Sequence, residues 1–255
     1  MNSFFKNAGA LALVCLTGAS LCVAQTNNPQ RVRDLNSHSW WVYYGDHPVR
    51  NSKWGILTEM QIRRTDFASA WQQLLLRQGT TYRLSPRVQL GGGYGFIRTS
   101  RYGGFPVTRA FDEHRLFQQA ILKHEAGRLE LEHRYRVEQR WLEASTGNAS
   151  SWRRQNRFRY QLRGSVPLSA VSANGQQWYL FAGDELFLHF GPNYGASLFD
   201  QNRAFAGIGY KLSRANRLEI GYLNQFLIQR GGSVEESNHT FRIQFTSAAR
   251  LFGRR

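Results

Sequence analysis

The sequence predicts an all-β protein: an antiparallel transmembrane β-barrel of about ten strands, with twelve strands as the alternative. Three observations lead to this fold class. Long segments alternate charged and apolar residues, no stretch after residue 24 is apolar enough to span a membrane as a helix, and short links alternate with longer ones. The clearest segment is 129–141, LELEHRYRVEQRW, where charged side chains hold almost every second position and mostly apolar ones lie between. Because strand side chains alternate between faces, this segment has one charged and one largely apolar face.

The length of these segments indicates which way the two faces point. Each segment runs for about a dozen residues, roughly twice the usual globular strand. A soluble sandwich buries its apolar face and needs no such length. A transmembrane barrel instead turns its apolar side to lipid and its polar side to the lumen. We therefore expect the charged faces to line a lumen.

Residues 1–24 are predicted to be a cleaved secretory signal peptide. Lys6 precedes an apolar stretch over residues 8–24, and Cys22-Val23-Ala24 forms a small-x-small cleavage site. This stretch falls short of the roughly twenty residues that a transmembrane helix needs. Both cysteines of the chain lie here, so the mature chain is expected to form no disulfide. We expect an N-terminal periplasmic or lumen-side segment at 25–52 and the barrel domain at 53–255.

The first strands of the barrel are predicted from alternation. Residues 53–64 alternate Trp, Ile and Met with Glu, Gln and Arg, and residues 71–84 alternate Leu and Tyr with Gln, Arg and Thr. Residues 88–99 contain the run GGGYG, which indicates bends or a close approach of neighbouring strands. A phosphate-binding loop would need a following helix and a lysine, which this run lacks.

The links between the remaining strands predict the topology. These strands are expected at 113–124, 129–141, 152–163, 177–190, 202–212, 217–229 and 238–246. Short links at 85–86, 126–127 and 213–216 alternate with longer ones, such as 144–151, as in bacterial barrels with short periplasmic turns. Ten strands would place both chain ends on the periplasmic side. The aromatic run at 40–44 would be an odd eleventh strand, a segment outside the wall, or half of a pair that makes twelve.

The charge of the chain is strongly basic, and arginine accounts for most of it. The formal net charge is +16, from 33 basic and 17 acidic residues, and only four of the basic residues are lysines. Such a balance can indicate nucleic-acid binding. Here the arginines alternate with Glu and Gln along strands, and arginine suits buried pairing with carboxylates. Together with export, this pattern favours a charged lumen and argues against a nucleic-acid partner.

The alternation yields a set of candidate lumen-lining residues. They are Glu59, Arg63, Glu130, Glu132, Arg134, Arg136, Glu138, Arg140, Arg153, Arg157, Arg159, Arg163, Glu185, Arg203, Glu219 and Gln225. In the first interpretation they form a self-neutralising network that fills a narrow barrel, since unpaired buried charge is costly. In the second, surplus arginine accepts a small anionic solute, because guanidinium forks suit carboxylate and phosphate. The segment 152–163 contains five arginines and no acid, which favours the second interpretation.

Large aromatic residues near strand ends and on apolar faces predict interfacial girdles. The candidates are Trp54, Tyr82, Trp141, Trp152, Tyr160, Trp178, Tyr210 and Tyr222. In a soluble barrel the same residues would be core, and ligand-stacking platforms are a third possibility.

The sequence offers no pattern typical of catalysis. None of the seven histidines belongs to a His-Glu-x-x-His metal motif, and no serine-centred elbow is present. Asp184 and Glu185 are adjacent on a strand and should point to opposite faces, which argues against joint acid–base work. We therefore expect no catalytic residue, no metal site, no cofactor and no enzymatic activity.

Several short motifs resemble one known family. Residues 199–225, FDQNRAFAGIGYKLSRANRLEIGYLNQ, resemble the DUF2490 family of uncharacterised bacterial outer-membrane β-barrel proteins. Further family-like motifs are Asp184-Glu185-x-Phe187, Glu113-x-Arg115-x-Phe117-x-Gln119 and Arg136-x-Glu138-x-Arg140. The resemblance covers essentially the mature chain. It implies the fold and the outer membrane as location, and it implies no reaction.

The sequence thus predicts a monomeric outer-membrane barrel, in contact with outer-membrane lipids, that has a structural role or acts as a narrow anion-preferring channel or binding protein. Two alternatives belong to other classes. An outer-membrane lipid-modifying enzyme would need a nucleophile and a base at a rim. A periplasmic lipocalin-like binding barrel would have an apolar inner face.

Overall fold

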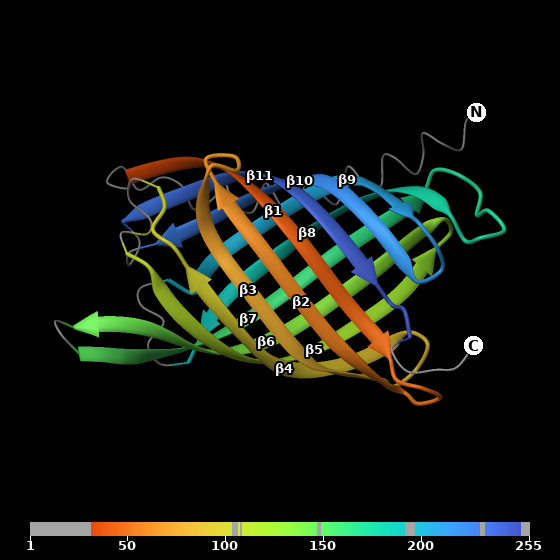
Figure 1. The fold of residues 1–255 in the computed structure, drawn as a ribbon, viewed down its shortest axis with the longest axis horizontal. Helices are drawn as coiled ribbons and strands as arrows, with labels where there is room; N and C mark the ends of the chain where they lie inside the picture. Colours follow the sequence, from red (N-terminus) through yellow and green to blue (C-terminus); the bar gives the residue numbers. More distant parts are fainter. Residues whose placement is uncertain are drawn as a thin grey trace.

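The chain folds into a single closed β-barrel (Figure 1). The structure is a computed structural model that describes residues 32–103, 107, 109–146, 149–191, 197–229 and 233–250. The predicted signal peptide lies outside these residues. The strands are β1 (Val32–Pro48), β2 (Trp54–Thr65), β3 (Ala70–Arg83), β4 (Val88–Thr99), β5 (Phe111–Ala126), β6 (Leu129–Thr146), β7 (Ala149–Pro167), β8 (Gln177–Phe190), β9 (Phe199–Lys211), β10 (Asn216–Gln229) and β11 (Val234–Ser247). The prediction of an all-β barrel is confirmed.

The barrel closes through one parallel pair. All neighbouring strands run antiparallel except β1 and β11, which pair in parallel from Val32 opposite Val234 to Gly45 opposite Ser247. An odd number of strands cannot alternate direction all the way round, so one parallel seam is a geometric requirement. We call the end where β1 and β11 start the N-mouth and the end where they finish the C-mouth.

The predicted count of ten strands is wrong, because the described chain contributes eleven. The additional strand comes from the segment 25–52, of which residues 32–48 form β1 in the wall. Its first half, VRDLNSHS, lacks the charged–apolar alternation of the other strands. It joins the wall by pairing with β11 from Val32 onward, and β2 pairs with it only from His38 onward. As a result, the wall starts at the N-mouth and ends at the C-mouth, so its two ends do not lie on one side.

The β6–β7 connection also differs from the prediction. A polar loop was expected at 144–151, whereas β6 continues to Thr146 and β7 starts at Ala149. The two strands, green in Figure 1, extend beyond their neighbours at the N-mouth. The backbones of the two strands pair with each other along this extension. The small polar residues of this stretch give no sign of that pairing.

The distribution of side chains is the inverse of a soluble domain. Large apolar residues are exposed on the outside, among them Leu76, Leu90, Leu116, Ile208 and Ile220. The buried interior is dominated by arginine, glutamate, glutamine and hydroxyl side chains. Strand lengths run from 12 residues in β2 to 19 in β7.

The interior also contains an aromatic cluster that the sequence analysis did not anticipate. Trp40, Tyr179, Phe181, Phe205 and Leu223 are buried together inside the barrel, with Val42 packed against them. They lie among charged residues and, as shown below, several arginines stack on them. In the described part of the chain, no helix has the length and apolar character to cross a membrane.

Candidate functional site

The barrel interior gathers most of the predicted lumen residues. Those that are buried are Glu59, Arg63, Arg136, Glu138, Arg140, Arg157, Arg159, Glu185, Glu219 and Gln225. Glu132, Arg134, Arg163 and Arg203 are partly buried and line a cavity. Glu130 and Arg153 differ from the rest, because they lie exposed at the C-mouth and the N-mouth respectively.

Glu138 lies at the centre of the charged network and is fully buried. Arg157 donates to it from Nε at 2.9 Å and from Nη2 at 2.6 Å. Arg159 donates from Nη1 at 2.7 Å, and Arg77 Nη2 lies 3.6 Å from the carboxylate. Such charge-assisted, forked contacts are the strongest hydrogen bonds that proteins form.

Two further carboxylates extend this network across the barrel. Glu185 accepts from Arg159 Nε at 3.0 Å and from Nη2 at 2.6 Å, and from Arg134 Nη2 at 2.9 Å. Glu59 accepts from Arg77. The result is a continuous series of ion pairs from β2 through β3, β6 and β7 to β8, which forms a charged layer across the interior.

Each half of the barrel has its own ion-pair cluster. Towards the N-mouth, Glu113 receives both Arg115 and Arg140, with contacts between 2.5 and 3.1 Å. Towards the C-mouth, Glu219 accepts from Arg163 Nη2 at 2.5 Å and from the Tyr179 hydroxyl at 2.7 Å. These carboxylates are therefore already engaged by donors of the chain itself.

Three arginines of the interior have a different environment. No carboxylate of the described residues lies within 4.0 Å of Arg63, Arg203 or Arg242, the distance that defines an ion pair. Instead, Arg63 Cζ lies 3.8 Å from the centroid of the Trp40 ring, and Arg203 Cζ lies 5.0 Å from the same centroid. Arg242 lies 4.9 Å from the centroid of Phe205. Cation–π contacts of this kind hold a guanidinium in place without neutralising it.

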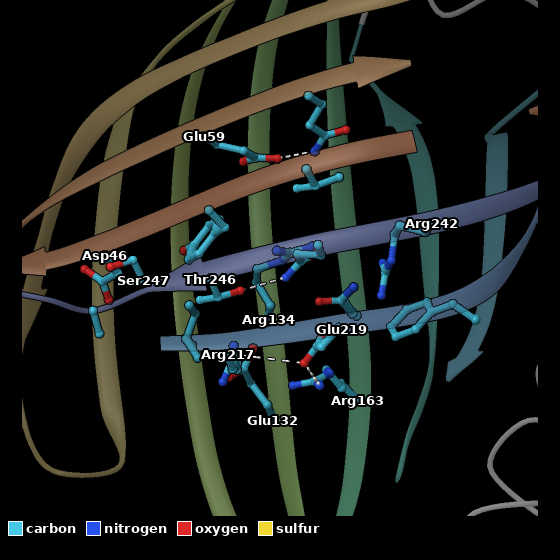
Figure 2. A pocket seen from close by; sticks show the side chains of 18 of the residues that line it. Asp46, Glu59, Glu132, Arg134, Arg163, Arg217, Glu219, Arg242, Thr246 and Ser247 are labelled. Atoms are coloured by element: carbon cyan, nitrogen blue, oxygen red, sulfur yellow. Dashed lines mark hydrogen bonds and ion pairs between the residues drawn. The ribbon is translucent and has the colours of Figure 1, made fainter. Parts of the chain in front are cut away.

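Two cavities lie on either side of the charged layer. The C-mouth cavity (Figure 2) has a volume of about 290 Å³. Ten basic but only five acidic residues line it. The N-mouth cavity has a volume of about 410 Å³, with eight basic and three acidic residues. Glu59, Gln61, Arg159 and Arg203 line both cavities, so the charged layer is where they meet. A third space of about 560 Å³ lies under the β5–β6 turn at the C-mouth.

Tyr102, between β4 and β5, contributes a partly buried phenol to the N-mouth cavity. Tyr102 bridges to Val107, and its hydroxyl donates to Glu236 at 3.4 Å. Burial raises the pKa of the Tyr102 hydroxyl well above its ordinary value, and the nearby Glu236 carboxylate adds to the increase. The hydroxyl therefore stays protonated and acts as a donor.

The predicted girdle residues do not form a single ring. Trp54 packs edge-on against Tyr82, and Trp178 lies tilted against Tyr210, with ring centroids 4.9 and 4.5 Å apart; all four lie at the C-mouth. Trp141 and Trp152 lie near the N-mouth, where Trp152 contacts His114 at 4.9 Å. Tyr160 and Tyr222 lie midway along their strands and bond to His133 and His239.

Several further residues of the interior and the rim were not among the predicted lumen or girdle residues. Inside the barrel these are Arg77, Glu113, Arg115, Asp200 and Arg242, and outside, at the N-mouth, Phe67, Trp71 and Phe241. The alternation along their own strands was the available signal: Arg77 shares its face with Gln73 and Thr81, and Arg242 lies between Phe241 and Ile243. Asp184 and Glu185 do point to opposite faces, since Asp184 accepts from Asn202 while Glu185 is in the charged layer.

The interior presents N–H donors and positive charge in excess of carboxylates. Within the described residues, no group of three or more His, Cys, Asp or Glu side chains could hold a metal ion. The cationic side chains outnumber the acids in both main cavities. What the arrangement can do chemically is to attract and hold negatively charged groups.

Comparison with known proteins gives a family and one distant relative. Residues 37–236 match the model of a family described as a protein of unknown function, DUF2490. An uncharacterised protein of Methylorubrum extorquens is 28% identical over 222 residues, which cover 85% of this chain and 90% of the relative. No solved structure matches the chain.

Proposed function

Because this chain belongs to the DUF2490 family, whose description names no activity, we propose its function from its architecture. The protein is an integral barrel of the bacterial outer membrane, and a cleaved signal peptide directs its export. It is not an enzyme, and its interior, closed by the charged layer, prefers small anions. The observation that carries this proposal is the inverted barrel, with apolar side chains outside and ion pairs inside.

The outer surface supports a membrane location. A transmembrane strand needs about ten residues, and every strand of this barrel is at least 12 residues long. Trp54 and Trp178 expose 53% and 46% of their surface at the C-mouth, where a lipid interface would accept their rings. A patch of scattered leucines alone would be unremarkable, but here the apolar residues face outwards on successive strands.

The strand count of this barrel is odd, whereas bacterial outer-membrane barrels usually have an even number of strands. The requirement in lipid is that every backbone group be paired and that no sheet edge remain open. The parallel β1–β11 pair meets this requirement along 14 register positions. An eleven-strand wall is therefore as compatible with a bilayer as an even one.

The charged interior argues against the main alternative, a lipocalin-like binding barrel. A lipocalin-like barrel would offer an apolar inner wall to its ligand. In this barrel, the most deeply buried side chains include Arg136, Glu113, Glu138, Glu219 and Glu236. The lumen of a barrel widens with the number of strands: side chains fill the interior at about eight strands, and an open channel remains at about sixteen. Eleven strands therefore favour a narrow or closed lumen.

Fractionation and conductance of the refolded protein test this proposal. We expect the mature protein to co-fractionate with outer membranes and to migrate faster unheated than boiled on a gel. In planar bilayers we expect small anion-selective steps. Conductance is expected to rise in the double variant Arg77→Ala with Arg159→Ala, because both side chains lie in the charged layer. The outward Arg98→Ala serves as the control.

Two results would contradict the proposal. A mature protein that stays in the soluble periplasmic fraction would exclude the membrane barrel. Large cation-selective steps from the wild type would exclude both the closed layer and the anion preference.

A further inference from the structure

Arg203 and Arg242 bring uncommitted hydrogen-bond donors to the C-mouth cavity. Arg242 donates no hydrogen bond to any residue that the structure describes, although its guanidinium carries five N–H donors. Arg203 donates only through Nε, to Gln201 at 3.2 Å. Both side chains line the cavity, and Figure 2 shows Arg242 pointing into it without a polar contact.

Aromatic rings hold both guanidiniums in position. Arg242 lies 4.9 Å from the centroid of Phe205, and Arg203 lies 4.7 Å from that of Phe187. A guanidinium held by its face leaves its edge donors free for a forked contact with oxygen atoms. The β1–β11 register places Arg242 beside Trp40, over which Arg203 also lies, so the two arginines share one neighbourhood.

The acidic residues of the cavity are already occupied by other groups. Glu185 is held by Arg159 and Arg134, and Glu219 by Arg163 and Tyr179. Asp46 accepts from Thr81 at 2.8 Å and from Gln89 at 2.7 Å. Ten basic residues therefore share the cavity with only five acidic ones, and the remaining positive charge is not neutralised by the residues that line it.

The walls of the cavity indicate the class of ligand. Trp40, Phe205 and Leu223 line it but expose at most 4% of their surface, so they offer little to an apolar ligand body. A volume of about 290 Å³ admits only a small molecule. Two free guanidinium edges and several unneutralised charges suit a hydrophilic anion with more than one negative charge.

We propose that the C-mouth cavity binds a small multivalent oxyanion, a phosphate or a short polycarboxylate, between Arg203 and Arg242. This inference rests on the proposed anion-preferring interior and names its ligand. Guanidinium edges from β9 and β11 contact the oxygen atoms, and the other cations of the cavity supply the attractive field.

Calorimetric titration of the folded mature barrel in detergent tests this proposal. The probes are inorganic phosphate, citrate, acetate and chloride at matched ionic strength. We expect phosphate or citrate to bind at least about tenfold more tightly than acetate and chloride, since the loss of one charge-assisted contact changes affinity by about that factor. Phosphate alone would identify the phosphate class, and citrate alone the polycarboxylate class.

Variants locate the site. Arg242→Gln and Arg203→Gln should each weaken binding about tenfold or more. Arg98→Gln should not, because Arg98 is an exposed arginine paired with Asp112 on the outer rim. If Arg242→Gln fails to fold, Arg242→Lys retains the charge without the planar fork and should fold with weakened binding.

Three results would overturn the proposal: no binding by the folded wild type, equal binding of acetate and citrate, or wild-type affinity in both glutamine variants. Fractionation and conductance are separate measurements. A barrel that inserts in membranes but binds none of the probes would therefore disprove this inference and leave the proposed location in place.

Discussion

Glu138 shows how strongly a single residue of this interior depends on its partners. Its side chain is fully buried and receives three hydrogen bonds from Arg157 and Arg159. Burying a carboxylate is costly, and here the arginines compensate for that cost only as long as all partners remain. Loss of the negative charge would leave Arg157 with Asp200 and Arg159 with Glu185 as their remaining counter-charges.

We therefore expect Glu138→Gln to destabilise the barrel by about 3 kcal/mol, the usual cost of breaking a buried ion pair. The measurement is the free energy of unfolding from urea titration of the refolded protein. The control is Asp112→Asn, which removes the half-exposed rim pair with Arg98 and should cost about 0.5 kcal/mol or less. Equal effects of the two substitutions would contradict the central role of Glu138.

At this scale, the sequence predicted which residues face inwards better than it predicted their partners. Alternation identifies Glu138, Arg157 and Arg159 as inward residues, because face is a local property of the strand. The pairing of Arg159 with both Glu138 and Glu185 depends on the register of three strands, which no single segment encodes. For the same reason, the lack of a carboxylate near Arg242 could not be anticipated.

Among the elements, the β3–β4 pair explains the glycine-rich run. Gly79 on β3 lies opposite Gly93 on β4, and a Cβ on Gly93 would overlap the backbone of Gln78 and Gly79. The predicted close approach of strands at this run is therefore real. At Gly95 a Cβ would lie 3.5 Å from the nearest backbone oxygen, which is an ordinary contact.

We expect Gly93→Ala to destabilise the barrel by about 1–3 kcal/mol through overpacking, and Gly95→Ala to cost clearly less. Urea midpoints of the two refolded variants provide the comparison. The two glycines lie two residues apart on the same strand and so face the same side of the sheet, which makes them a matched pair. A larger effect at Gly95 would show that the two strands are not packed as described.

β1 and the β6–β7 hairpin mark the limit of prediction for the elements. The strands with regular alternation, such as β6 and β7, were predicted at residues 129–141 and 152–163, but their extension to Thr146 and Ala149 was not predicted. β1 begins with polar residues and so carries no hydrophobic period to detect. In both cases the partner strand determines the structure, and the local sequence contributes little.

For the whole molecule, the parallel seam can be tested by cross-linking. Asn36 on β1 lies opposite Asn238 on β11. Neighbouring strands are about 4.8 Å apart, within the range that a disulfide bridges. We expect Asn36→Cys with Asn238→Cys to cross-link on oxidation of the mature chain. Both native cysteines lie in the predicted signal peptide, so the mature chain has no other thiol.

The control pair is Asn36→Cys with Gln225→Cys, because Gln225 lies on β10, one strand further away. This pair should remain reduced under the same conditions. Cross-linking of the control alone, or of neither pair, would show that β1 does not close the barrel against β11.

The parallel seam also determines the sidedness of the protein. A wall with an even number of strands returns the chain to the side on which it started. Here β1 starts at the N-mouth, whereas β11 ends at Ser247 at the C-mouth. In a bilayer, Val32 and Ser247 would therefore face different compartments. The two ends of the wall would then meet different sets of molecules, one in the surroundings of the cell and the other in the cell envelope.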